Sequence, residues 1–70
     1  MRLARIVHRN NNPWWYGDGT KINPPIGTIV QYERDVNNWC FVYFPGVRGG
    51  VTMSGRMFNR YFEDLDNETS

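Results

Sequence analysis

Two runs of alternating side chains, at residues 26–34 and 39–44, form the clearest pattern in the chain. Both runs are rich in β-branched and aromatic residues, and the Asp and Asn residues between them, at 35–38, favour tight-turn dihedral angles. The pattern predicts an antiparallel hairpin. Val30 and Tyr32 should share one face of its first strand, because successive side chains of a strand point to opposite faces.

The second strand of this hairpin is apolar on both faces. One face carries Cys40, Val42 and Phe44, and the other carries Trp39, Phe41 and Tyr43. Such a strand is either covered on both sides or leaves one surface for a partner. Cys40 is expected to be a small buried hydrophobic residue, because free cysteine is among the most buried residue types.

Shorter patterns predict two more strands. Residues 3–8 are partly apolar on both faces, which is typical of an end strand in a small barrel. Residues 51–53 follow a glycine-rich turn over 45–50, where glycines permit the positive φ angles of a tight return. These segments would flank the central hairpin.

The segment over residues 54–65 allows two structures. In the first, Ser54 caps a single helical turn whose apolar Met57 and Phe58 pack onto the end of the sheet. Residues 61–65 then form a fifth strand with Phe62 directed inward. In the second, the three- and four-residue spacing of apolar side chains continues one amphipathic helix to Leu65. The periodicity of the apolar residues fits both structures.

Residues 9–25 form a long connection that contains three consecutive aromatic residues, Trp14, Trp15 and Tyr16. Long loops of this kind are usually functional, disordered or partly structured, and three large rings argue against disorder. If the segment is extended, at least one ring faces solvent or a partner. Alternatively, the loop folds back and buries most of the cluster as a lid on the core.

This order of elements resembles the SH3-like small barrel. We expect an all-β chain, a small five-stranded SH3-like barrel with one short helical turn before the last strand, as a single domain over residues 1–65. Residues 66–70 should form a frayed acidic tail. The acidic segment typical of signalling SH3 domains that bind Pro-rich peptides has no counterpart here.

Among small barrels, the chain also resembles the photosystem I reaction-centre subunit IV family. The resemblance rests on Ile6 and Val7, Trp15 and Tyr16, residues 26–30, residues 41–44 and residues 59–65. The extra segment over 17–25 departs from that family. The resemblance implies a shape used for docking onto larger assemblies, and short chains of this kind are also similar to small uncharacterised proteins of bacteria and their phages.

Composition and charge limit the cellular compartments and the kinds of structure to be expected. The single cysteine excludes an intramolecular disulfide, and no apolar run is long enough for a membrane span. Without a leader-like start, the expectation is a reducing cytoplasm. All eight Lys and Arg residues lie in residues 1–62 with three of the seven acidic residues, so the body carries +5 and the last eight residues carry −4.

Catalytic and metal-binding patterns are weak. His8 is the only histidine, which leaves no His and Cys set for a metal. A triad of Ser54, His8 and Asp18 has no support in spacing, and the carboxylates near the end of the chain fit a solvated tail. Residues 17–21 lack the full spacing of a phosphate-binding loop. We therefore expect no enzyme activity, no cofactor and no metal.

Two binding hypotheses remain. The first is a protein-interaction module that docks through the aromatic loop and a sheet edge, using Trp14, Trp15, Tyr16, Trp39 and Tyr43. The second is a barrel that binds single-stranded nucleic acid by base stacking and phosphate contacts, using Arg5, Arg9, Lys21, Arg34 and Arg48. The sequence pI of about 7.9 favours the protein partner, because dedicated nucleic-acid domains usually exceed about 9. An exposed aromatic face on the 39–44 strand would also favour self-association.

Overall fold

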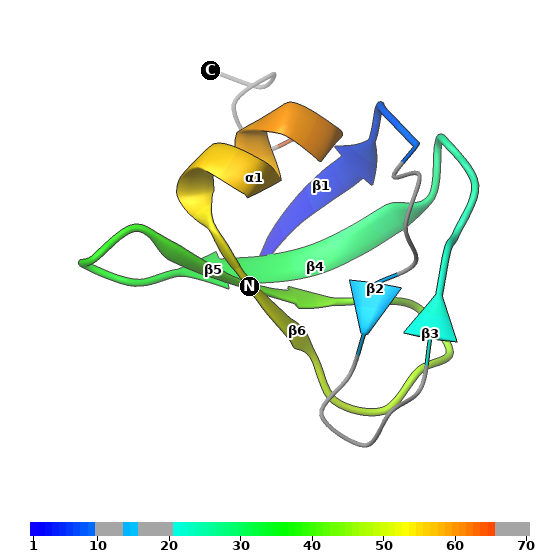
Figure 1. The fold of residues 1–70 in the computed structure, drawn as a ribbon, viewed down its shortest axis with the longest axis horizontal. Helices are drawn as coiled ribbons and strands as arrows, with labels where there is room; N and C mark the ends of the chain where they lie inside the picture. The colour runs from blue at the N-terminus through cyan, green and yellow to red at the C-terminus, as the bar shows by residue number, and fades with distance from the viewer. Residues whose placement is uncertain (10–13, 16–20, 66–70) are drawn as a thin grey trace.

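The computed structural model describes residues 1–9, 14–15 and 21–65, with only the backbone of Trp15 (Figure 1). Seven strands and one helix occur over these residues. They are β1 (Arg2–Ile6), β2 (Trp14–Trp15), β3 (Lys21–Ile22), β4 (Ile29–Arg34), β5 (Trp39–Tyr43), β6 (Val51–Ser54), α1 (Gly55–Tyr61) and β7 (Phe62–Asp64). The predicted acidic tail at 66–70 lies outside the described residues.

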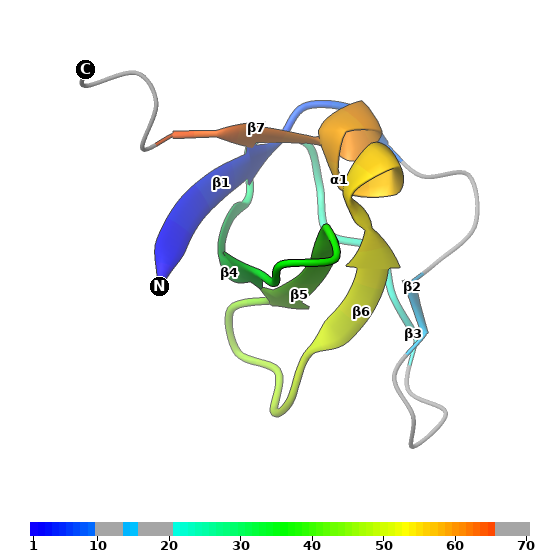
Figure 2. The same cartoon turned by 90° about the vertical axis from the view of Figure 1, so that its left-hand side faces the viewer.

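Five strands form one antiparallel sheet in the order β6-β5-β4-β1-β7, and β2 pairs with β3 in a separate short ladder. The predicted central hairpin is confirmed, with Gln31 opposite Tyr43 and Arg34 opposite Cys40. Figure 2 shows the sheet curling so that α1 lies between β6 and β7, and α1 contacts both of these edge strands. The prediction of an all-β fold with a short helix before the last strand is confirmed. β6 and β7 are the two edge strands of the described sheet and do not pair with each other.

The turn between β4 and β5 is built by its Asp and Asn residues, as the sequence predicts. The Asp35 carboxylate oxygen Oδ1 accepts hydrogen bonds from the backbone N–H groups of Asn37 and Trp39, each at 2.9 Å. Asn38 has φ 67°, in the left-handed region that Asn tolerates better than most residues. Its carbonyl accepts from Gly55 N at 2.8 Å, so the turn also holds the start of α1.

A side-chain cap marks the start of helix α1, and strand pairing marks its end. The Ser54 hydroxyl caps its first turn by accepting from Met57 N at 3.2 Å. At the other end Phe62 is extended, with φ −127°, and β7 pairs with β1. The alternative of one helix over 54–65 is therefore wrong, because pairing with β1 takes the chain out of the helix after Tyr61.

The core lies on the inner side of the curled sheet, under α1. Its aromatic part is continuous: Phe58 lies 4.4 Å from Tyr32 and stacks on Phe62 at 5.0 Å, and Phe62 contacts Trp14 at 6.0 Å between ring centroids. Phe62 is inward, as expected. Met57 is not, since 44% of it is exposed; a helix of seven residues turns one side to the sheet, and Phe58 occupies that side.

Candidate binding face

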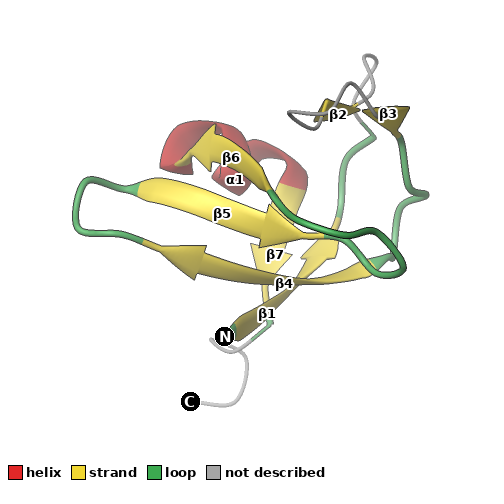
Figure 3. Ribbon diagram, turned by 90° about the horizontal axis from the view of Figure 1, so that it is seen from below, coloured by secondary structure: helices red, strands yellow, loops and turns green. Residues whose placement is uncertain are grey.

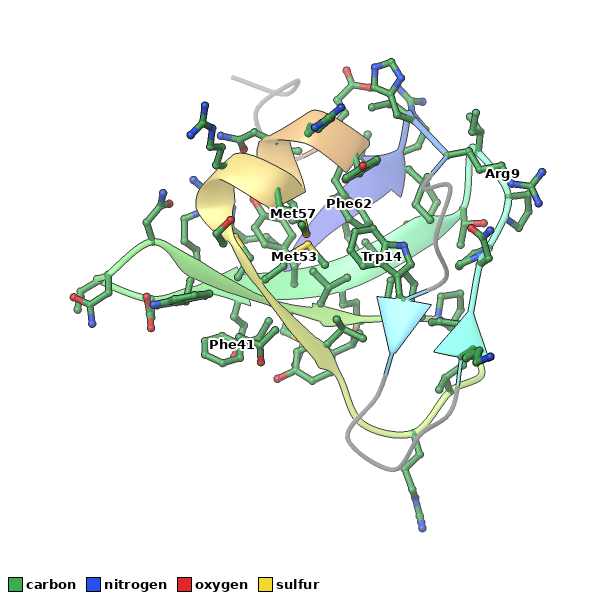
Figure 4. All side chains as sticks on the ribbon, viewed as in Figure 1. Arg9, Trp14, Phe41, Met53, Met57 and Phe62 are labelled. Carbon is green, nitrogen blue, oxygen red and sulfur yellow. The ribbon has the colours of Figure 1, made fainter. Side chains whose placement is uncertain are left out.

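The two faces of β5 have the same apolar character but different surroundings. Cys40 and Val42 are completely buried, and Phe44, just after the strand, is nearly so. On the other face Trp39 is 48% exposed, and Phe41 and Tyr43 are half-buried. Figure 4 shows Phe41 on the opposite side of the sheet from Trp14, Met53 and Phe62. The sequence-based assignment of these two faces is confirmed, and only the inner one is covered by the described residues.

Neighbouring strands extend this apolar surface. Gln31 pairs with Tyr43 on one side and with Leu3 on the other, so these three side chains form a row across the sheet. Ile29, two residues before Gln31, is 45% exposed, and Leu3 is 41% exposed. We call the surface made by Leu3, Ile29, Trp39, Phe41 and Tyr43 the outer face. Figure 3 views the sheet from this side, with β5 and β6 in front of α1.

A hollow of about 520 Å³ opens at the Tyr43 end of the outer face. It is lined by Leu3, Ile29 and Tyr43 and by the turn that follows β5, including Pro45 and Val47. Hollows beside exposed rings accept the large aromatic side chains that dominate interfaces. The hollow and the rings therefore belong to one continuous surface.

Gly50 sets the position of the Tyr43 ring. A Cβ atom at Gly50 would lie 2.8 Å from Cε1 of Tyr43 and 3.1 Å from the carbonyl oxygen of Val42. Only a residue without a side chain lets the Tyr43 ring lie this close to the backbone. The glycine-rich turn thus does more than reverse the chain, since it leaves space for one ring of the outer face.

The predicted protein-binding residues divide between core and surface. Trp14 is only 7% exposed, and its ring meets Tyr61 edge-on at 5.4 Å. The structure supports the core-lid alternative for this residue, so its ring is not open to a partner. The side chain of Trp15 and all of Tyr16 lie outside the described residues. Trp39 and Tyr43 do lie together, on the outer face.

Three members of the outer face were missing from the predicted site: Leu3, Ile29 and Phe41. The alternation along residues 39–44 could have added Phe41, which falls between Trp39 and Tyr43. Leu3 and Ile29 have no such signal, because only the pairing of β1 with β4 brings them together.

The predicted nucleic-acid-binding cations do not gather on one surface. Arg5 pairs with Glu63 at 2.6 Å, and Arg34 lies over the Phe58 ring at 5.5 Å and donates to Asn59. Arg9, Lys21 and Arg48 are exposed but belong to separate segments, after β1, in β3 and in the turn after β5. The guanidinium groups of Arg5 and Arg34 therefore already have protein partners.

Cations do meet at a different place, between the end of β1 and α1. A second hollow, of about 540 Å³, is lined by His8, Arg9, Asn59, Arg60 and Tyr61. Arg60 lies in the last turn of α1, with its guanidinium 5.7 Å from the centre of the Tyr61 ring. A cation here also complements the negative end of the helix dipole, so helix stabilisation accounts for Arg60 without a ligand.

Tyr32 is the one buried polar side chain in the described residues whose oxygen lacks a hydrogen-bond partner. Burial raises the pKa of Tyr32 to about 12, and the nearby Asp64 carboxylate adds to the rise. Its ring is fixed between Phe58 and the Arg2 guanidinium, which lies 5.7 Å from the ring centre. The hydroxyl is thus kept protonated inside the core.

Within the described residues, no group of three or more His, Cys, Asp and Glu side chains could hold a metal ion. Cys40 is a buried free thiol, as predicted. None of the described helices is long and apolar enough to cross a membrane.

Comparison with known proteins gives no relative. No family model matches the chain, and neither the curated proteins nor the solved structures yield a match. The outer face must therefore be interpreted from its own chemistry.

Proposed function

We propose that this chain is a non-enzymatic protein-interaction module that binds its partner through the outer face. The observation that carries the proposal is the uncovered side of β5, where three aromatic side chains stand in a row beside exposed Ile29 and Leu3. Contiguous exposed apolar side chains mark interaction sites in folded proteins. Trp14, one of the residues predicted to bind, does not belong to this surface, because it is part of the core.

The chemistry of the outer face favours a protein over nucleic acid. Its charged side chains are Glu33, opposite Phe41, and Arg5, which Glu63 already neutralises. A surface for a phosphate backbone needs several available cations next to the stacking rings, since phosphate contacts supply most of the affinity. Tyr and Trp beside a hollow are instead typical of protein hot spots.

The fold is consistent with this use. We infer an SH3-like barrel, supported by the strand order β6-β5-β4-β1-β7 and by the helix before the last strand. In such a small barrel the inner side of the sheet holds the core, while the outer side is free to carry the binding residues.

Single-stranded nucleic acid remains the alternative partner. The observation in its favour is the row of Trp39, Phe41 and Tyr43 on an open sheet, because stacking on such rings is tolerant of sequence. In that case Arg48, in the turn beside Tyr43, would supply a phosphate contact.

Site-specific crosslinking tests the proposal. A photoreactive aromatic amino acid is placed at position 41, and as a matched control at position 56 on the exposed side of α1, in cells that produce the chain. We expect protein adducts from position 41 only, and their loss when Tyr43→Glu is added. Equal adducts from both positions would contradict the proposal, and nucleic-acid adducts at position 41 would transfer the function to the alternative.

A further inference from the structure

We propose that the partner segment bound by the outer face presents an arginine side chain together with a large apolar one. This inference rests on the proposed function and names the chemistry of the partner for the same surface. It follows from a difference between the two ends of the outer face. Carboxylates stand beside the rings at the Trp39 end, whereas the surface around Tyr43 is apolar.

At the Trp39 end, each ring lies across from a carboxylate. Glu33 is directly opposite Phe41 in the register of β4 and β5. Asp35 is opposite Trp39, because its backbone N–H donates to the Trp39 carbonyl at 2.9 Å and its Oδ1 accepts from the Trp39 N–H at 2.9 Å. The two rows are two residues apart, or about 7 Å along the strand. One side chain of a partner can therefore reach both carboxylates and both rings.

Neither carboxylate has a cation partner within the part of the chain that the structure describes. The ion pairs there join Arg2 to Asp64 and Arg5 to Glu63. Asp35 uses its Oδ1 in the turn, and its Oδ2 makes no hydrogen bond to the described residues. Two exposed carboxylates beside aromatic rings thus remain for a cation from outside the chain.

The nearby cations are held by other groups. A hollow of about 470 Å³ beside Phe41 is lined by both carboxylates and also by Arg2 and Arg34. Arg2 binds the Asp64 carboxylate at 2.5 Å. The Arg34 guanidinium donates to Asn59 of α1 and lies 5.5 Å from the centre of the Phe58 ring, which is in the core. Arg34 therefore leaves the outer side of the sheet to the carboxylates.

Arginine fits this end of the face better than any other side chain. Its planar guanidinium pairs with carboxylates through two parallel hydrogen bonds and stacks on aromatic faces, whereas the lysine ammonium is a more strongly hydrated point charge. Cation–π contact with Trp or Phe adds to the attraction. An acidic partner would be repelled by Glu33 and Asp35.

The other end of the face accepts an apolar side chain. The hollow of about 520 Å³ beside Tyr43 is lined in part by Leu3 and Ile29. Tyr43 is four residues from Trp39, or about 13 Å along the strand. Side chains four residues apart in an extended segment lie on one side at the same spacing. The partner segment therefore carries its arginine and its large apolar residue within about four positions of each other.

Selection from a random 12-residue peptide library, with the purified full chain as bait, tests the inference. We expect enrichment of peptides that combine arginine with an aromatic or large aliphatic residue, and loss of these peptides with Glu33→Lys as bait. Enrichment of acidic or uncharged peptides, or no enrichment that depends on Glu33, would overturn the inference. Circular dichroism verifies that the variant is folded.

A double-mutant cycle on one selected peptide tests the contact itself. Glu33→Gln in the chain, or citrulline in place of the peptide arginine, should each weaken binding about two- to fivefold. The two changes together should weaken it little more than either alone, because both remove the same interaction. Arg48→Gln, in the exposed turn after β5, is the control and should not weaken binding. Effects of Glu33→Gln and citrulline that multiply would overturn the pairing.

Photocrosslinking from position 41 separates this inference from the docking proposal. With the partner of the cell, Glu33→Lys should remove most protein adducts, and Arg48→Gln should not lower them. Adducts that persist in Glu33→Lys would overturn arginine as the contact and retain the docking face. Absence of adducts from position 41 in the original chain would remove the face itself.

Discussion

The two faces of β5 are made of similar side chains but differ in burial. Cys40, Val42 and Phe44 are buried in the core, while Trp39, Phe41 and Tyr43 lie on the other side of the sheet. Apolar side chains on the inner face are accounted for by folding, because burying each stabilises the domain by about 1.5–3 kcal/mol. The same side chains on the outer face gain little of that within one chain.

The contrast identifies which apolar residues need an explanation beyond folding. A strand that only closed a core would carry polar residues on its outer side, as antiparallel sheets with one solvated face usually do. Here Gln31 and Thr52 follow that rule on the neighbouring strands, and β5 does not. The exception marks β5 as the strand on which binding depends.

Replacing one phenylalanine on each face should produce the largest difference in stability. Phe44→Ala removes a buried ring and should lower the free energy of unfolding by about 3–5 kcal/mol. Phe41→Thr keeps a strand-forming residue and should cost about 1 kcal/mol or less. Urea denaturation of both variants at dilute concentration measures the difference. Equal costs would show that the outer face also supports the fold.

Trp14→Ala should destabilise by about 3 kcal/mol, because the ring packs on Tyr61 and Phe62 at the edge of the core. Thermal unfolding provides the measurement, and Trp39→Ala serves as the matched exposed control with a much smaller effect. A Trp14→Ala variant of unchanged stability that had lost its binding would instead restore this residue to the binding surface.

Gly50→Ala should cost about 1–3 kcal/mol, because its methyl group would displace the Tyr43 ring. Adding Tyr43→Ala removes the obstructing ring and should recover a large part of the loss. Chemical denaturation of the two single variants and the double variant measures this coupling. If the single effects simply add, Gly50 does not position the ring.

Tyr32→Phe should have the smallest effect, an increase of about 1 kcal/mol in stability at neutral pH, because it removes a buried hydroxyl without a partner. The variant should also resist alkali better. The folded-state pKa of about 12 exceeds the ordinary value of 10, so the stabilising protonated form is complete below pH 10 and is lost as pH rises toward 12. Between pH 9 and 12, the free energy of unfolding should fall more steeply with pH for the original chain than for the variant. Urea denaturation at several pH values measures it.

Much of this fold could be predicted from local patterns. The β4–β5 hairpin follows from alternation together with the Asp and Asn turn, and the capped helix follows from Ser54. The end of α1 could not be predicted in this way, since Tyr61, Phe62 and Leu65 have a spacing that fits a helix and a strand equally. Pairing of β7 with β1 decides it, and that contact joins opposite ends of the chain.

The candidate site could be predicted only in part from the sequence, for the same reason. Trp39 and Tyr43 follow from alternation within one strand, whereas Leu3 and Ile29 join them only through the register between strands. For Trp14, the sequence could not distinguish a binding residue from a core residue. Its place in a loop suggested exposure as readily as burial, and only its contacts with Tyr61 and Phe62 distinguish the two.

The most direct test of the central claim, that the uncovered face of β5 is a binding surface, is photocrosslinking from position 41 in cells that produce the chain, with position 56 on α1 as the control. We expect protein adducts from position 41 that Tyr43→Glu removes, and none from position 56. Equal adducts from both positions, or no adducts from position 41, would contradict the account.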